Sequence, residues 1–111
     1  MDNILKRKGF TVSAKSLTHS TLTGEALREE RLTGYSREKN VKITYSEFSD
    51  GRKRLSIVIH GSGATREREE KIMSLGGKVD LNEGERLYAV FNVKNRKHAE
   101  EIVNEIFKDN A

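Results

Sequence analysis

The sequence predicts an α+β fold: a two-layer sandwich with the order (α)ββαββα, in which a four-stranded, mostly antiparallel sheet carries two helices on one face. Apolar and polar residues alternate within residues 41–60 and again within 86–93, which is the period of a β-strand. A Gly-containing turn separates the strands of each pair, and a segment with helical character follows each pair. Two such ββα units side by side can bury their apolar faces in one shared core.

Length and composition limit the size of that core. The chain has 111 residues, which is one domain with or without an additional arm. Apolar and charged residues each make up 34% of it, so the core is small and the surface highly charged. The absence of Cys excludes disulfides and Cys-ligated metal centres. The longest aliphatic run is Ile57, Val58 and Ile59, which is far too short to span a bilayer, and we expect a cytoplasmic protein without membrane contact.

Residues 1–40 are predicted to form an N-terminal basic arm that is partly irregular. Residues 3–8 can form a short helix that ends at Gly9. Residues 11–23 are rich in Ser and Thr and hold too few large side chains to offset the entropy of ordering them alone. They form a flexible arm or lie across the rest of the domain. A short helix is predicted near 24–33, because Thr23 can cap it and Gly34 can end it.

Residues 41–111 are predicted to form a single α+β domain. Its first unit has strands near 41–48 and 54–60, where Val41, Ile43 and Tyr45 begin the alternation of apolar and polar residues. The Asp50-Gly51 dipeptide between the strands is a strong hairpin signal, because Gly readily adopts positive φ. Gly61, Ser62 and Gly63 end the second strand, and a charged helix is predicted near 64–75.

The second unit repeats this order with strands near 78–82 and 86–93. Asn95 can cap the last helix, predicted near 95–108, which has the clearest amphipathic pattern in the chain. The predicted core of the two units comprises Val41, Ile43, Leu55, Ile57, Ile59, Ile72, Leu87, Phe91, Val103, Ile106 and Phe107.

The positive charge is unevenly distributed along the chain. The formal net charge is +4. Residues 1–42 carry nine basic and five acidic side chains, whereas the basic and acidic side chains of 43–111 balance. A basic asymmetry of this kind favours a polyanionic partner such as nucleic acid. The plain alternative is a solvated surface of mixed charge.

One face of the predicted sheet is expected to lie outside the helical layer. If the helices cover the side of Leu55, Ile57 and Ile59, the other face is mainly polar and carries Lys42, Thr44, Ser46, Arg54, Ser56, His60, Tyr88 and Asn92. Such a face can bind single-stranded nucleic acid, because an aromatic ring stacks on a base while Lys and Arg neutralise phosphates. An antiparallel sheet also exposes polar residues to water without any ligand. A third alternative is that the N-terminal arm covers this face.

Two short basic clusters are candidates for phosphate contacts: Lys6, Arg7 and Lys8, and Arg52, Lys53 and Arg54. Each cluster has only one acidic residue close to it in sequence, whereas Arg66, Arg68 and Lys71 alternate with Glu and their field largely cancels. The predicted nucleic-acid-binding residues are therefore Lys6, Arg7, Lys8, Lys42, Arg52, Lys53, Arg54 and Tyr88. The alternative is that termini and hairpin tips are simply solvated.

The sequence predicts no catalytic residue, metal site or cofactor. His19, His60 and His98 lie in different elements, and none is spaced as a metal ligand. The Gly-rich link at 61–63 lacks the Gly-Lys-Ser/Thr ending of a P-loop. We therefore expect a small non-enzymatic protein that binds DNA or RNA through its basic clusters. The alternative is an adaptor or inhibitor that binds a protein partner through the arm or an uncovered sheet edge, and a homodimer is compatible with both.

A more distant alternative comes from the start of the chain. Residues 4–10 followed by Thr18, His19 and Ser20 resemble the opening of HicA-type RNA-cleaving toxins, in which a helix ending in Gly-aromatic precedes a strand with the catalytic His. The turn at Asp50-Gly51-Arg52 and the strand ending at His60 are also similar to that family's hairpin. The resemblance implies RNA cleavage with His19 in the catalytic position. The pattern departs in three ways: Leu17 and Thr18 stand where the family has Gly and Ser, about 30 residues separate His19 from the turn, and the second ββα unit has no counterpart.

Overall fold

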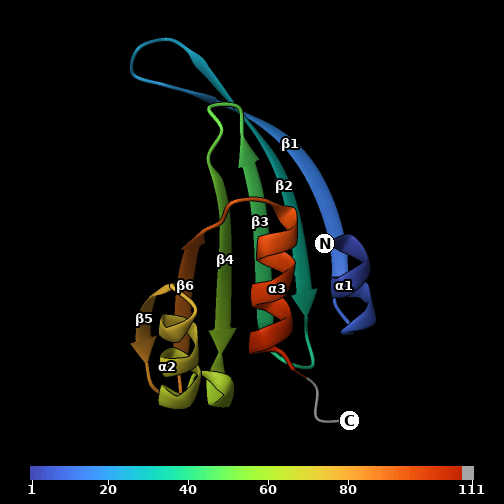
Figure 1. The fold of residues 1–111 in the computed structure, drawn as a ribbon, viewed down its shortest axis with the longest axis vertical. Helices are drawn as coiled ribbons and strands as arrows, with labels where there is room; N and C mark the ends of the chain where they lie inside the picture. The colour runs from blue at the N-terminus through green and yellow to red at the C-terminus, as the bar shows by residue number, and fades with distance from the viewer. Residues whose placement is uncertain (109–111) are drawn as a thin grey trace.

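The computed structural model describes residues 1–108, which form a six-stranded antiparallel sheet with helices on one face (Figure 1). The strands are β1 (Thr11–Ser20), β2 (Ala26–Ser36), β3 (Val41–Phe48), β4 (Lys53–His60), β5 (Lys78–Asn82) and β6 (Arg86–Asn92). They lie in the order β1-β2-β3-β4-β6-β5. The helical elements are α1 (Asp2–Arg7), the 3₁₀ turn η1 (Gly61–Gly63), α2 (Arg66–Ser74) and α3 (Arg96–Ile106).

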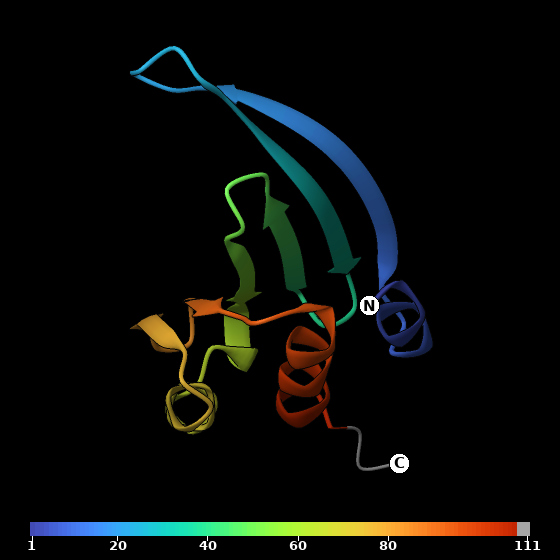
Figure 2. The same ribbon diagram turned by 45° about the horizontal axis from the view of Figure 1, so that its top comes forward.

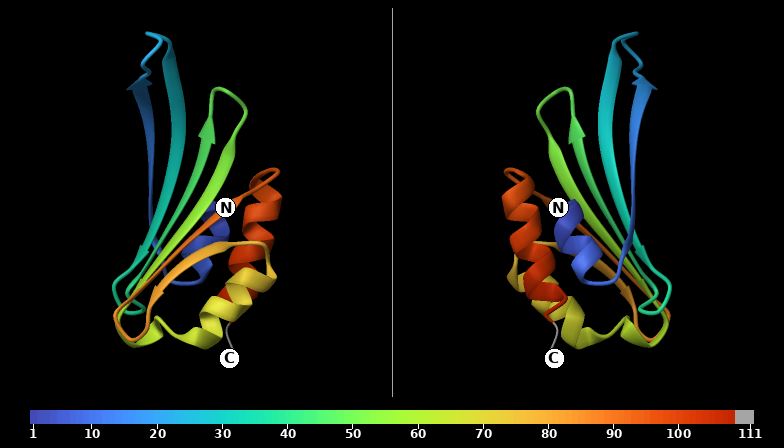
Figure 3. Two further views of the ribbon diagram at one scale, coloured as in Figure 1. Left: turned by 90° about the vertical axis from the view of Figure 1, so that its left-hand side faces the viewer. Right: turned by 90° about the vertical axis from the view of Figure 1, so that its right-hand side faces the viewer.

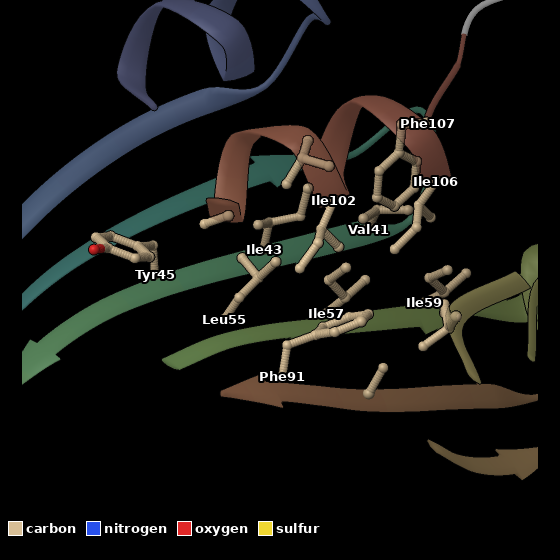
Figure 4. Packing of buried hydrophobic residues seen from close by; sticks show 14 of the residues in the cluster. Val41, Ile43, Tyr45, Leu55, Ile57, Ile59, Phe91, Ile102, Ile106 and Phe107 are labelled. Atoms are coloured by element: carbon tan, nitrogen blue, oxygen red, sulfur yellow. The ribbon is translucent and has the colours of Figure 1, made fainter. Parts of the chain in front are cut away.

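The sequence analysis of residues 41–108 is confirmed in its main features. Four of the strands and two helices fall where alternation, turns and caps predicted them. Gly51 has φ +94° in the turn between β3 and β4, and the Asn95 side chain accepts a hydrogen bond from the backbone N–H of His98 at the start of α3. All the predicted core residues are buried, and Figure 4 shows α3 lying over the apolar side chains of β3, β4 and β6. The core also includes Leu5, Phe10 and Tyr45, which are almost completely buried.

The number of strands is a correction, because the sheet has six strands where the sequence predicts four. The predicted helix near 24–33 is wrong: this segment belongs to β2, and the Ser/Thr-rich segment before it forms β1. Gly24 has φ +82° in the tight turn between them, a conformation that suits a hairpin. β2 then pairs with β3 from Glu29 opposite Phe48 to Ser36 opposite Val41. These ladder hydrogen bonds and cross-strand contacts outweigh the weak helical pattern of the segment.

All three helices lie on the same side of the sheet (Figure 3). α3 crosses the middle of the sheet, α2 packs against β5, and α1 packs against β1 and β2. The close approach of α1 depends on Gly34 in β2, because a Cβ there would lie 2.9 Å from Leu5 Cδ1. Phe10 and Phe107 then meet edge to face, with ring centroids 6.1 Å apart. α1 is thus the third helix of the layer, where the sequence predicts two on the sheet.

The hairpin of β1 and β2 extends past the rest of the domain. Its strands curve away from the helices, and its tip lies farther from the helical layer than any other turn of the sheet (Figure 2). The molecule is consequently elongated, with principal extents of 45 × 27 × 23 Å.

The two-layer arrangement predicts that truncating neighbouring residues of β4 to Ala lowers the free energy of unfolding by unequal amounts. Ile57 is fully buried beneath the helices, whereas Val58 points to the opposite face and is half-buried. Ile57→Ala is expected to lower the free energy of unfolding by about 2–5 kcal/mol, because it leaves a cavity in the core. Val58→Ala is the matched control and should cost about 1 kcal/mol or less. Urea denaturation measures both, and equal losses would contradict a core confined to the helical side.

Candidate nucleic-acid interface

The face of the sheet opposite the helices is uncovered by any element of residues 1–108 (Figure 3). We call it the open face. The strand registers place on it all the polar residues that the sequence assigned to this side: Lys42, Thr44, Ser46, Arg54, Ser56, His60, Tyr88 and Asn92. The arm does not cover this face, because β1 and β2 extend the sheet sideways instead. The open face is therefore wider than the sequence predicts.

Side chains on the open face form rows that run across the strands. The ring row consists of Thr11, Tyr35, Lys42, Val58, Tyr88 and Asp80, which are partners in successive registers. Tyr35 is 49% exposed and Tyr88 is 39% exposed. Three strand spacings separate the two tyrosines, about 14 Å in all. An open depression of about 490 Å³ next to Tyr35 is lined in part by Thr11, Ser13 and Thr33. Each ring therefore presents area on which a planar group can stack.

Two further rows run parallel to the ring row. The hydroxyl row consists of Ser13, Thr33, Thr44, Ser56, Val90 and Lys78. The basic row consists of Lys15, Arg31, Ser46, Arg54 and Asn92. Alternate residues of a strand share a face, so the basic row lies about 13 Å from the ring row with the hydroxyls between them. Rings, hydroxyl donors and guanidinium groups are thus arranged in order along the strands.

Phe48 orients two arginines at the end of β3. The Arg52 and Arg54 guanidinium carbons lie 5.1 and 5.2 Å from the centroid of its ring, within the range of a cation–π contact. Arg52 Nε also donates to an Asp50 carboxylate oxygen at 2.7 Å, an exposed pair that contributes little to stability. The hydrogen bonds from Arg52 hold the pKa of the Asp50 carboxyl below its usual range. Arg54, by contrast, forms no ion pair within residues 1–108.

Glu29 is a buried carboxylate on the same face, with 1% of its surface exposed. Arg31 donates to it twice, with Nε at 2.8 Å and Nη2 at 3.0 Å. Ser46 Oγ donates to it at 2.6 Å, and His19 Nε2 lies 2.8 Å from its Oε1. The hydrogen bonds from Arg31 are the main cause that lowers the pKa of Glu29 to about 2; burial opposes this shift, and Ser46 and His19 add to it. This cluster joins β1, β2 and β3 and fixes the Arg31 guanidinium in the basic row.

The charges of the open face are mostly basic. Its cations are Lys15, Arg31, Lys42, Arg54, Lys78 and Arg86, and its carboxylates are Glu29 and Asp80. Glu29 is matched by Arg31. Within the described chain, Lys15, Lys42 and Arg86 form no ion pair. An uncompensated positive potential of this kind attracts polyanions.

The structure brings together only part of the predicted site. Lys42, Arg54 and Tyr88 lie on the open face, and Arg52 stacks on Phe48 at its end. Lys53 lies on the other face, opposite Glu47. The cluster of Lys6, Arg7 and Lys8 belongs to the end of α1 in the helical layer. There Lys6 pairs with Asp2 at 3.5 Å, and Lys8 Nζ donates to the Phe107 carbonyl oxygen. Arg52 and Arg54 therefore lie on a different side of the molecule from Lys6, Arg7 and Lys8, whereas Lys53 lies on the helical side.

The sequence analysis missed every residue that β1 and β2 add to the open face, and those with ring or basic side chains are Lys15, His19, Arg31 and Tyr35. They lie in the segment predicted to be an irregular arm with a short helix. The available signal is weak: a Gly-containing turn at Gly24 separates two segments of similar length, and no regular alternation of apolar and polar residues marks 26–36 as a strand.

Other kinds of site are not visible in residues 1–108. No group of three or more His, Cys, Asp or Glu side chains is arranged to hold a metal ion there. No helix in this part of the chain is long and apolar enough to cross a membrane.

The Glu29 cluster predicts a pH-dependent contribution to stability. Because its folded pKa of about 2 lies below the ordinary value of 4.5, the contribution is present above pH 4.5 and is lost as the pH falls towards 2. Glu29→Gln should therefore lower the free energy of unfolding at pH 7 by about 2 kcal/mol. The difference from the wild type should shrink towards pH 2. Glu30→Gln is the control on the opposite face, and chemical denaturation across this pH range checks both. A constant difference between Glu29→Gln and the wild type at all pH values would contradict the ionised cluster.

No protein-family model, curated protein or solved structure matches this chain. What the open face can bind follows from its own rings, hydroxyl groups and charges.

Proposed function

We propose that the protein binds single-stranded nucleic acid on the open face of its sheet. The observation that carries this proposal is the parallel arrangement of the ring row and the basic row on an uncovered surface. The bases would stack on Tyr35 and Tyr88, while phosphates would contact Lys15, Arg31 and Arg54. Hydroxyl groups of the row between them would donate hydrogen bonds to phosphate and sugar oxygens.

A single strand fits this surface better than a duplex does. The two tyrosines can stack only on bases that are free of their own base pairs. A duplex would offer phosphates to the basic row but would leave both rings without a partner. Stacking on an aromatic ring is tolerant of sequence, and phosphate contacts carry no sequence information, so we expect weak sequence preference and strong salt dependence. The chemistry leaves both DNA and RNA as ligands.

Arg54 and Lys53 provide a matched test, because they are neighbours in β4 that point to opposite faces. Arg54→Ala should weaken binding of a random single-stranded oligonucleotide about tenfold at low salt, which is ~1.4 kcal/mol, because a phosphate contact is lost. It should also reduce the slope of log affinity against log salt by about one. Lys53→Ala should leave both quantities nearly unchanged.

Fluorescence titrations at several salt concentrations measure the oligonucleotide affinity and its salt slope for Arg54→Ala and Lys53→Ala. Replacing Lys6, Arg7 and Lys8 together by Ala extends the comparison to the helical layer. Equal losses for Arg54→Ala and Lys53→Ala, or a larger loss for the α1 cluster, would contradict binding on the open face.

Tyr88 provides the test of stacking. Tyr88→Ala should weaken oligonucleotide binding by about 1–3 kcal/mol, because base–aromatic stacking contributes that much per base. Tyr88→Phe retains the ring and should bind within a few-fold of the wild type. The salt slope should stay the same in both variants, since no phosphate contact is removed. If the Phe variant loses as much affinity as the Ala variant, the ring does not act by stacking.

Binding of a protein partner is the second candidate, and the edge of the sheet favours it. The Thr21 N–H donates to the Glu25 carbonyl oxygen, so Thr21 is hydrogen-bonded to the β2 side of the hairpin. In an antiparallel pair, every second residue of a strand is bonded to the neighbouring strand. The odd-numbered residues of β1 are therefore bonded to β2, and the N–H and C=O groups of the even-numbered residues point away from it. These residues are Val12, Ala14, Ser16, Thr18 and Ser20. Leu22 is fully exposed at the hairpin tip. A strand of a partner protein can form hydrogen bonds with the free edge, and an apolar side chain of that partner can pack against the exposed tip. Absence of oligonucleotide binding at low salt would favour this function.

RNA cleavage stays the more distant prediction. His19 lies on the open face, where its Nε2 contacts Glu29. Gel analysis of a single-stranded RNA after the titration distinguishes binding of an intact strand from its cleavage.

A further inference from the structure

A small cavity lies on the helical side of the sheet, away from the open face. It has a volume of about 130 Å³ and opens where α3 ends, between that end, η1 and the turn that joins β2 to β3. Its floor is apolar and includes Val41, Ile59 and Phe107. Gly63 contributes no side chain here; a Cβ at this position would lie 3.0 Å from Ile59 Cγ2. The space suits a ligand of only a few non-hydrogen atoms.

The polar side chains that line this cavity are all cationic. They are Lys39 from the turn, Arg68 from α2 and Lys108 after α3, and no carboxylate of residues 1–108 lines it. Arg68 lies over the Phe107 ring, with the guanidinium carbon 5.2 Å from the centroid. Its Nη1 atom is buried and has no hydrogen-bond partner within the described chain. Arg68 has further N–H donors besides this enclosed atom, and an anion in the cavity that Arg68 lines would accept hydrogen bonds from those donors.

Within residues 1–108, none of the acidic side chains around this cavity forms an ion pair with Arg68. Glu105 lies 3.4 Å from Lys71 and 3.7 Å from Lys108. Glu69 is the partner of Arg66 at 3.9 Å. Glu67 and Glu70 line the adjoining open groove, and neither forms an ion pair with Arg68 in residues 1–108.

The other cations near this cavity are only partly engaged. Lys39 Nζ donates to the Lys8 carbonyl oxygen at 2.8 Å, which leaves further donors free. Lys8 Nζ donates to the Phe107 carbonyl oxygen. Lys108 has its Glu105 partner but is otherwise exposed. The cavity therefore combines excess positive charge with an apolar floor.

We propose that this cavity is a binding site for a small aliphatic carboxylate. The carboxylate group would accept hydrogen bonds from Arg68 and Lys39, because a guanidinium and an ammonium group together match its charge and its lone pairs. The short aliphatic part would lie on Val41 and Ile59. A bare inorganic anion would satisfy Arg68 but would leave the apolar floor unused, so affinity should rise from acetate to butyrate. The site lies on the opposite side of the sheet from the proposed nucleic-acid surface and does not depend on it.

Calorimetric titration of the full chain with sodium butyrate, sodium acetate, inorganic phosphate and sodium chloride tests this site. We expect saturable binding of butyrate, weaker binding of acetate, and still weaker or no binding of phosphate and chloride. Absence of saturable butyrate binding would overturn the proposal. Phosphate binding as tight as that of butyrate would also overturn it, because it would show an anion site without use of the apolar floor.

Arg68→Met removes the charge but keeps the contact with the Phe107 ring, and it should weaken butyrate binding tenfold or more. Arg66→Met is the matched control in the same helix, outside the cavity, and should bind butyrate as the wild type does. Circular dichroism establishes that each variant is folded. If Arg68→Met does not fold, Lys39→Gln provides the second test and should weaken binding several-fold. Unchanged affinity in the folded cavity variants would contradict the assignment.

Discussion

The ladder between β2 and β3 is the interaction on which the open face depends. It runs from Glu29 opposite Phe48 to Ser36 opposite Val41 and attaches the whole N-terminal hairpin to the sheet. Without it, the ring row would lose Tyr35 and the basic row would lose Lys15 and Arg31. It also places Gly34 beneath α1, where the missing side chain lets Leu5 reach the core. One strand pairing therefore sets both the width of the exposed surface and the position of the first helix.

A single buried carboxylate stabilises the region where this hairpin leaves the body of the sheet. Glu29 accepts hydrogen bonds from β2 and β3 and contacts His19 of β1, so the three strands share one polar centre. Charge-assisted hydrogen bonds of this kind also restrict geometry, because the guanidinium fork of Arg31 fits the carboxylate in one plane. Arg31 is thereby oriented on the open face while part of its charge is neutralised. Lys15 and Arg54, which lack such a partner in residues 1–108, supply most of the free charge in the basic row.

The two sides of the sheet differ in how they expose cations. On the open face, cations stand in a broad row beside hydroxyls and rings, which suits an extended polyanion. On the helical side, Lys39, Arg68 and Lys108 line a small, partly open cavity with an apolar floor, which suits a compact monoanion. The net charge of +4 alone does not indicate what kind of anion each side could bind. The placement of the cations, on an extended surface or around a small cavity, does.

The sequence by itself determined the elements that local chemistry controls. The alternation of β3, β4 and β6, the Asp50-Gly51 turn, the Asn95 cap and the apolar stripe of α3 are short-range signals, and the structure agrees with each. They also sufficed to place Lys42, Arg54 and Tyr88 on one face, because side chains alternate along a strand. Only the tertiary structure decided the state of residues 11–36, whose Ser, Thr and charged side chains carry little local preference. These residues form strands because the edge of β3 that does not pair with β4 has N–H and C=O groups that need hydrogen-bond partners. That edge is created by the folding of residues 41–60, which are distant in sequence from β1, so local patterns in 11–36 do not reveal it.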